Sequence, residues 1–150
     1  MSELANNPSA SYHYDLQDRY EAGIRVIGPE VRSAKRGEIH LKGAYVTMRP
    51  DGVWLIGLRI APYKPARSVQ MNYEPTRDRK LLLSKKEIGE LAGTLQAKGL
   101  TVLPISLYTK GGFVKVELAV GRGKRKIDKR QAIKRRDVDR RIQRALKTRR

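Results

Sequence analysis

The sequence predicts a mainly β protein with a small antiparallel β-barrel, flanking helices and a basic C-terminal tail. Three observations predict this fold. Short β-rich runs flank tight-turn dipeptides, one long stretch has the apolar spacing of an amphipathic helix, and the last 30 residues have a composition that cannot form a core of their own.

The chain divides into three expected parts. Its 150 residues are enough for one domain and an appendage. We expect a mobile N-terminus over residues 1–11, a barrel over 12–120 and the tail over 121–150. The tail holds 15 Lys and Arg against three Asp, so it carries +12 of the net charge of +18. Such uneven charge is typical of proteins that bind a polyanion.

The first elements alternate between strands and a helix. Residues 20–28 have a strand-like pattern, and residues 30–38 form a short helical candidate closed by a glycine. The β-rich runs 44–48 and 53–60 flank an Asp-Gly dipeptide, which is a strong hairpin signal. Residues 61–78, with three prolines, are expected to be a long surface loop.

Residues 84–100 are the clearest helix. Ser84 and Glu87 have the spacing of a capping box. Apolar residues then recur at positions i, i+3, i+4 and i+7, which places them on one face. Gly89 and Gly93, four residues apart, are predicted to let this helix lie close to the sheet.

A second hairpin leads into the tail. Residues 101–109 and 113–120 are β-rich and are joined by Lys-Gly-Gly. Gly121 and Gly123 are predicted to end the last strand. The tail is predicted to be disordered in the free protein, because its like charges oppose helix formation, and helical where an anion neutralises them.

The sequence indicates no catalytic or metal chemistry. Cysteine is absent, and His13 and His40, the two histidines, have no helical spacing. No nucleophile elbow or phosphate-cradling Walker loop occurs. We therefore expect no enzyme, cofactor or metal. A Mg²⁺-dependent nuclease using Glu21, Glu30 or Asp51 remains an alternative.

Neither a signal peptide nor a membrane span is evident. The N-terminus lacks a basic segment followed by an apolar run, and no stretch approaches about 18 apolar residues. The tail also lacks the aromatic residues of a membrane-binding helix. We expect a cytoplasmic protein whose polyanionic partner is nucleic acid.

Basic and aromatic residues suggest an RNA surface. Basic residues gather where the long loop meets the helix, at Arg77, Arg79, Lys80, Lys85 and Lys86. Seven tyrosines offer rings on which bases can stack, although packing is the alternative role for most of them. Small barrels with exposed aromatics and basic loops commonly bind RNA.

Read in order, several stretches resemble one family. "YEAGIRVIGPEVRSAKRGE", "EPTRDRKLLLSKKEI" and "SLYTKGGFVKVELAVGRGKRKIDKRQAIKRRD" resemble the SsrA-binding protein family, small protein B (SmpB), over about residues 12–140. The resemblance implies an OB-like barrel that binds the tRNA-like domain of transfer-messenger RNA (tmRNA). It further implies delivery of tmRNA to stalled ribosomes for trans-translation, with the tail forming a helix in the vacant mRNA channel.

The expected partners follow from the resemblance. They are tmRNA, the stalled 70S ribosome with rRNA near the decoding centre and mRNA channel, and elongation factor Tu, indirectly through charged tmRNA. We expect a monomer. The alternative function is that of a ribosomal or rRNA-binding structural protein, which also combines a small domain with a basic extension.

The candidate site residues fall into three groups. The RNA-binding candidates of the barrel combine positions that the resemblance implies with the basic cluster and its neighbours: Asn7, Tyr12, Glu21, Arg77, Arg79, Lys80, Leu82 and Ser84. The resemblance assigns Tyr14 and Tyr45 to the ribosome. The ribosome-binding candidates of the tail are Lys124, Lys126, Ile127, Asp128, Lys129, Arg130, Lys134, Arg135 and Arg136.

The chain departs from the family pattern at three places. Two basic residues and a histidine usually follow the N-terminal asparagine, whereas Pro8 and Ser9 follow Asn7 and His13 stands one place late. Ser84 stands where Asn or His is frequent. Ile127 replaces an aromatic or His, so it can pack but stacks less well on a base.

Overall fold

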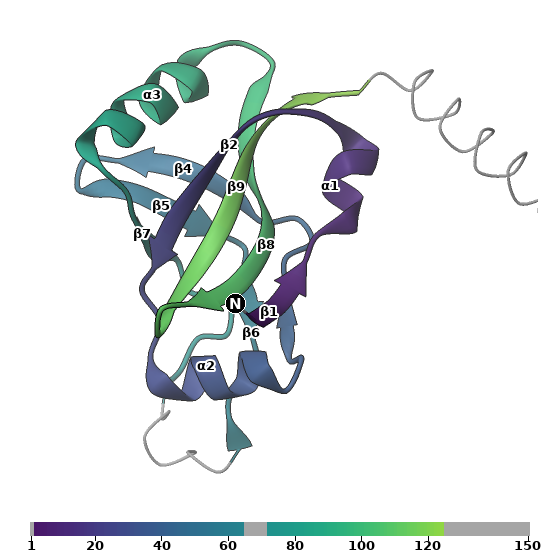
Figure 1. Cartoon of the computed structure of the whole chain (residues 1–150), viewed down its shortest axis with the longest axis vertical. Coiled ribbons are helices and arrows are strands. Elements are labelled where there is room, and N and C mark those ends of the chain that lie inside the picture. The colour runs from purple at the N-terminus through teal and green to yellow at the C-terminus, as the bar shows by residue number, and fades with distance from the viewer. Residues whose placement is uncertain (1, 65–71, 125–150) are drawn as a thin grey trace, which may run out of the picture.

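A computed structural model describes residues 2–64 and 72–124. Most of this part consists of strands, and three helices lie around them (Figure 1). The helices are α1 (Pro8–His13), α2 (Gly28–Lys35) and α3 (Lys85–Gln96). The strands are β1 (Ser2–Asn6), β2 (Tyr14–Ile24), β3 (Ile39–His40), β4 (Tyr45–Arg49), β5 (Gly52–Ile56), β6 (Arg59–Ile60), β7 (Arg79–Leu82), β8 (Leu100–Lys110) and β9 (Phe113–Gly123).

Seven strands form one antiparallel sheet in the order β1-β8-β9-β2-β7-β5-β4, and β3 pairs with β6. The sheet curls, because β4 contacts β8 although the two strands are far apart in this order. The order ends at β1 and β4, so the described strands do not close a hydrogen-bonded ring. The predicted mainly β, OB-like antiparallel fold is confirmed, as a curled sheet that is not closed.

The interior of the curled sheet is the hydrophobic core. Leu55, Leu58, Leu107, Val116 and Leu118 are essentially inaccessible to solvent there. They come from β5, the β5–β6 turn, β8 and β9, so strands from distant parts of the chain share one core. Burial of such side chains is the main favourable contribution to folding.

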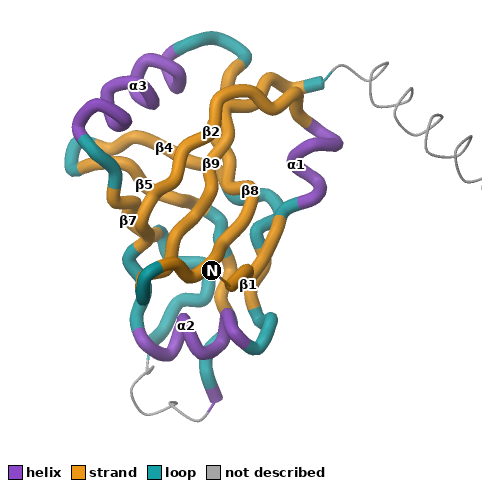
Figure 2. The backbone as a smooth tube through the Cα atoms, viewed as in Figure 1, coloured by secondary structure: helices purple, strands orange, loops and turns teal. Residues whose placement is uncertain are grey.

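Local turn chemistry sets both predicted hairpins. Gly111 and Gly112 both have positive φ, 58° and 81°, between β8 and β9, which suits a two-residue turn. The hairpin of β4 and β5 lies where it is predicted, but Pro50 and Asp51 form its turn, because Gly52 is already paired with Arg49 as the first residue of β5. The predicted run 53–60 is interrupted at Gly57, whose φ of 84° separates β5 from β6. Figure 2 shows the strands in orange and the loops that join them in teal.

The structure differs from the expected mobile N-terminus. Residues 2–6 form β1 on the edge of β8, and residues 8–13 form α1. Consequently β2 begins at Tyr14, not near residue 20. A strand of five residues has little sequence signal of its own; its hydrogen bonds to the edge of β8 and the packing of Leu4 and Ala5 against the core hold it in place.

Two predictions about glycines are also wrong. Gly121 does not end β9, because the strand continues past it beside the start of β2, and Gly123 is its last residue. Gly89 and Gly93 do not bring α3 against the sheet, since both are exposed and a Cβ at either would meet nothing within 4 Å.

The predicted helix is otherwise confirmed, although it ends at Gln96 and not near residue 100, where β8 begins. α3 begins after Ser84, whose Oγ accepts from the Glu87 amide at 3.2 Å. The Ser84 amide in turn donates to the Glu87 carboxylate at 3.2 Å, which completes the capping box. Leu91 is the fully buried residue of the apolar face.

The predictions for most of the tail fall on residues 125–150, which lie outside the described residues. The same is true of residues 65–71 in the proline-containing loop. None of the helices in the described ranges is both long and apolar enough to cross a membrane.

Candidate nucleic-acid interface

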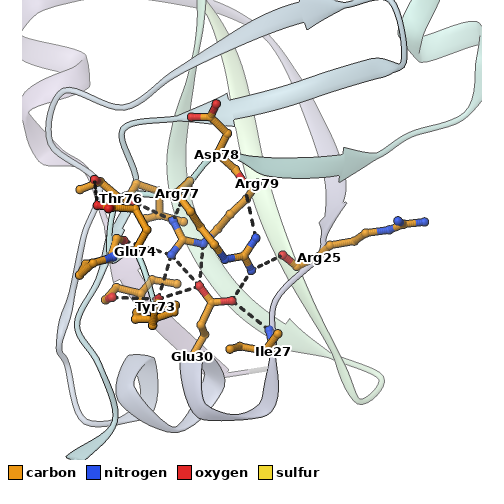
Figure 3. Close-up of polar contacts among 12 residues, drawn as sticks. Arg25, Ile27, Glu30, Tyr73, Glu74, Thr76, Arg77, Asp78 and Arg79 are labelled. Carbon is orange, nitrogen blue, oxygen red and sulfur yellow. Dashed lines mark hydrogen bonds and ion pairs between the residues drawn. The ribbon is translucent and has the colours of Figure 1, made fainter. Parts of the chain in front are cut away.

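A buried ion network joins α2 to the segment before β7 (Figure 3). Glu30 and Arg79 are both completely buried. One Glu30 oxygen accepts from Arg79 Nη2 at 2.6 Å, from Arg79 Nε at 2.9 Å and from the Tyr73 hydroxyl at 2.8 Å. The other accepts from the Ile27 amide at 2.9 Å and from Arg77 Nη2. The network fixes residues 73–79 against α2.

The network corrects the prediction for Arg79. Its guanidinium also donates to the backbone oxygens of Leu58, Pro75 and Arg77 at 2.6, 3.1 and 3.0 Å. An Arg that is fully buried and has these partners cannot reach an RNA phosphate. Arg77 is about one-third exposed, but its charge is already paired with Glu30. Arg79 is therefore a structural residue, and Arg77 has only part of its guanidinium available.

The surroundings of Glu30 keep it ionised. Burial alone would raise the pKa of its carboxyl, but the hydrogen bonds from Arg77, the Ile27 amide and Arg79 outweigh burial and lower that pKa. Burial and the hydrogen bond to Glu30 raise the pKa of Tyr73 to about 12. The carboxylate and the neutral phenol are therefore both stable at neutral pH.

Next to this network, four side chains share one outer face of the sheet. Gly23 of β2 is paired with Leu82 of β7, and alternate residues of a strand share a face. Glu21 and Arg25 therefore lie on the face that carries Lys80 and Leu82. We call this surface the β2–β7 face and define it by Glu21, Arg25, Lys80 and Leu82.

The β2–β7 face combines charge with an exposed apolar side chain. Leu82 is 48% exposed, Lys80 is half-buried and Arg25 is exposed. Figure 3 shows Arg25 pointing away from the buried network. Sequence reasoning missed Arg25. Alternate residues of a strand share a face, so the even spacing between Glu21 and Arg25 could have identified it. Ser84 follows this face at the start of α3, where it is exposed but serves as the helix cap.

Glu21 is an exposed carboxylate held by two neighbours. The Tyr108 hydroxyl donates to it, and Lys110 Nζ lies 3.3 Å from the same oxygen. The hydrogen bond from Tyr108 is the largest cause that lowers the pKa of Glu21, while burial and Glu21 raise the pKa of Tyr108 to about 12. An oriented carboxylate of this kind can accept hydrogen bonds from base amino groups.

A second surface lies around a cavity of about 440 Å³ beside α1. Tyr14 and Tyr45, which are 31 residues apart in sequence, both line it, so the structure brings these two predicted residues together. We call it the tyrosine cavity; its lining residues are Asn7, Ser9, Ala10, His13, Tyr14, Lys42, Gly43, Ala44, Tyr45, Thr101 and Leu103.

Asn7 anchors the start of α1. Its side chain is buried, with the amide nitrogen donating to the Pro104 oxygen at 3.0 Å and the amide oxygen accepting from Ser9 at 2.8 Å. Asn7 also lines the tyrosine cavity, and an RNA contact by Asn7 stays a prediction. Tyr12 is half-buried, edge-on to the His13 ring at 4.8 Å.

The described chain leaves the curled sheet next to α1. The Lys124 amide donates to the His13 oxygen at 2.9 Å, and its Nζ donates to the Ser11 oxygen at 2.9 Å. The tail candidates from Lys126 to Arg136 lie outside the described residues. In residues 2–64 and 72–124, no three His, Asp or Glu side chains are placed to hold a metal ion.

Known proteins resemble this chain over almost its whole length. The SsrA-binding protein of Rubrobacter xylanophilus is 47% identical over 99% of this chain and 98% of its own. The SsrA-binding protein of Oleidesulfovibrio alaskensis is 46% identical over 95% of this chain and 91% of its own. A chain in the solved structure described as "tmRNA-SmpB: a journey to the center of the bacterial ribosome" is 36% identical, with a TM-score of 0.68 over 86% of this chain and 93% of that chain.

A family comparison gives the same result. The pattern of the family described as SmpB protein matches residues 4–148. This range includes α1, the β2–β7 face, the tyrosine cavity and nearly all of the tail. The chain therefore belongs to the SmpB family of SsrA-binding proteins.

Proposed function

We propose that this protein binds the tRNA-like domain of tmRNA and brings it to stalled ribosomes for trans-translation. Family membership supports the function. The observation that carries its mechanism is the β2–β7 face, where an oriented carboxylate, two basic side chains and an exposed leucine lie together outside the core. RNA that is recognised by shape needs such mixed contacts to phosphates and base edges.

Two surfaces support a division of roles. In Figure 1, β7 and α1 lie on opposite sides of the sheet. The β2–β7 face lies at β7, and the tyrosine cavity and Lys124 lie at α1. In the proposal the β2–β7 face binds tmRNA, with help from the accessible part of Arg77. Tyr14, Tyr45 and the tail face rRNA near the decoding centre, and the tail becomes helical in the mRNA channel.

The remaining parts of the proposal follow from this role. The protein acts as a monomer in the cytoplasm and catalyses no reaction. Elongation factor Tu is reached indirectly, through the charged tmRNA. Phosphate attraction by the tail is salt-dependent, so the tail strengthens binding while the β2–β7 face supplies selectivity.

A sedimentation experiment tests the proposed function against that of a ribosomal structural protein. Full-length protein and charged tmRNA are added to ribosomes stalled at the end of a message without a stop codon, and to ribosomes paused within an intact message. The proposal predicts that the protein sediments with the first set only when tmRNA is present. Equal sedimentation with both sets at high salt, without tmRNA, would identify a structural rRNA-binding protein.

A further inference from the structure

We propose that Tyr108 is a positioning residue for RNA recognition. Its hydroxyl holds one oxygen of the Glu21 carboxylate, so that the other oxygen accepts a hydrogen bond from an uncharged donor of an unpaired nucleotide, either a base amino group or a ribose 2′-hydroxyl. The inference rests on the proposed function, since it takes the tRNA-like domain of tmRNA as the partner. It adds β8 to the surface that recognises this RNA, beyond the strands of the β2–β7 face.

Strand pairing places Tyr108 on the side of the sheet that carries Glu21. Leu107 is buried in the core, so alternation along β8 places Tyr108 on the outer side. Tyr108 is paired with Lys115 of β9, and Lys115 is paired with Gly23 of β2. Paired residues of neighbouring strands share a side, and Gly23 and Glu21 are alternate residues of β2. The Tyr108 side chain therefore reaches across β9 to Glu21.

The two side chains that hold Glu21 differ in rigidity. Tyr108 is only 9% exposed, and its hydroxyl donates to Glu21 Oε2 at 2.5 Å. Its raised pKa of about 12 keeps this hydroxyl protonated at neutral pH. The Lys110 side chain is 57% exposed, with Nζ 3.3 Å from the same oxygen, and exposed ion pairs hold their partners weakly. Tyr108 therefore sets the orientation of the carboxylate.

The second carboxylate oxygen of Glu21 is available to a ligand. The Glu21 side chain is 41% exposed. Its Oε1 lies 3.5 Å from Lys110 Nζ, a distance at which a hydrogen bond is weak. A carboxylate oxygen has two lone pairs, so Oε1 keeps acceptor capacity for RNA.

The surroundings of this oxygen favour an uncharged donor over a phosphate. Glu21 and Tyr108 belong to the wall of a cavity of about 510 Å³, which is lined by Glu3, Glu21, Ser106, Tyr108 and Glu117. Arg19 and Lys110 are paired with two of these carboxylates, which leaves no excess positive charge for a phosphate. Like charges brought together across an interface oppose binding. The group that reaches Oε1 is therefore an amino or hydroxyl group.

A carboxylate that is already oriented favours selective binding. A glutamate that is free to rotate loses rotamer freedom when an interface fixes it. Because Tyr108 fixes Glu21 in the free protein, this loss does not accompany RNA binding. A plain duplex has no unpaired nucleotide to reach Oε1, so Tyr108 increases the preference for the tRNA-like RNA and not the affinity for RNA in general.

The test compares Tyr108→Phe with Tyr20→Phe in full-length protein. Both substitutions remove one tyrosine hydroxyl that donates to a glutamate, since the Tyr20 hydroxyl donates to Glu90 of α3 at 3.1 Å. Affinities for the tRNA-like fragment of tmRNA and for a plain duplex of equal length are measured at about 0.15 M salt, where exposed charges are screened beyond about 8 Å. The ratio of the two affinities is the preference for the fragment.

We expect Tyr108→Phe to lower this preference by about 3-fold to 10-fold, the range for ordering one freed side chain on binding, and Tyr20→Phe to leave it unchanged. In a Glu21→Ala background, Tyr108→Phe should have no further effect, because the carboxylate that it positions is absent. NMR titration of the Glu21 carboxyl should show a higher pKa in Tyr108→Phe, since the hydrogen bond from Tyr108 is the largest cause that lowers this pKa.

A second fragment, with 2′-deoxyribose at its unpaired nucleotides, identifies the donor. If Tyr108→Phe also lowers the preference for this fragment, the donor is a base amino group. If the effect of Tyr108→Phe disappears with this fragment, the donor is a ribose 2′-hydroxyl.

The inference would be overturned if Tyr108→Phe and Tyr20→Phe changed the preference equally, if Tyr108→Phe still lowered it in the Glu21→Ala background, or if the pKa of Glu21 stayed the same. In each of these cases the unmodified protein would still prefer the fragment, and the proposed function would stand. An unmodified protein without this preference would contradict the proposed function together with the inference.

Discussion

Tyr14 lies directly on Gly121 of the neighbouring strand. A Cβ at Gly121 would stand 3.0 Å from the Cβ of Tyr14 and 3.2 Å from its Cγ and Cδ1. Contacts this short force the neighbour to move. The absence of a side chain at Gly121 therefore sets the position of one wall of the tyrosine cavity.

We predict that Gly121→Ala destabilises the protein by about 1–3 kcal/mol, the usual cost of overpacking a fitted site. Chemical denaturation measures this change. The matched control is Gly123→Ala two residues along β9, where a Cβ would meet nothing within 4 Å. Equal effects of the two substitutions would show that Tyr14 does not depend on Gly121.

The second prediction concerns the buried pair of Glu30 and Arg79. Glu30→Gln leaves the guanidinium of Arg79 buried without a counter-charge, so we expect a loss of about 3–5 kcal/mol in the free energy of unfolding. Glu38→Gln is the control, because Glu38 is exposed and its loss is expected to change stability by less than about 0.5 kcal/mol. A small effect of Glu30→Gln in urea denaturation would contradict the structural role of the pair.

The same carboxyl predicts a pH dependence. The pKa of Glu30 is lower in the folded protein than its ordinary value of 4.5, so the unfolded chain binds more protons in the acid range. Its stabilisation is complete above pH 4.5 and is lost as the pH falls through the lower folded pKa. Unfolding curves from about pH 3 to pH 7 should therefore show a steep acid loss that is shallower in Glu30→Gln. Parallel curves for the two proteins would rule this out.

The fourth prediction concerns the basic residues of the β2–β7 face. Lys80→Ala and Arg25→Ala should each weaken binding to tRNA-like RNA and lower the slope of log affinity against log salt by about 1, the effect of losing one phosphate contact. Titrations at several salt concentrations measure both quantities. Lys98→Ala, an exposed residue outside this face, is the control. Slopes that do not change would show that neither residue contacts a phosphate.

Local chemistry made parts of the fold predictable. The Gly111-Gly112 turn and the Ser84–Glu87 capping box each involve residues close in sequence, and both occur where the sequence predicts them. The N-terminal strand was not predictable in this way. Residues 2–6 form a short strand with two apolar residues, Leu4 and Ala5, and their structure depends on the edge of β8 about 100 residues away.

The candidate site shows the same limit. Arg79 and Lys80 are adjacent basic residues, but strand alternation sends Arg79 inward to Glu30, 49 residues away in sequence, and leaves Lys80 toward the surface. From composition alone the two residues are equivalent basic side chains, because only the fold shows that the Glu30 carboxylate is buried beside Arg79. Tyr14 and Tyr45 were predicted to share a ribosomal role from the family resemblance, and their shared cavity was visible only in three dimensions.

Selective RNA binding tests the central claim most directly. Full-length protein, a Glu21→Gln/Leu82→Ala variant and a Lys129→Ala/Arg130→Ala tail variant are titrated with a tRNA-like fragment of tmRNA at about 0.15 M salt, with a plain duplex of equal length as competitor. We predict that the first variant loses discrimination against the duplex by about tenfold or more, equivalent to at least about 1.4 kcal/mol. The tail variant should bind both RNAs more weakly but keep its preference. Selectivity that disappears with the tail charges and survives in the Glu21→Gln/Leu82→Ala variant would contradict the account.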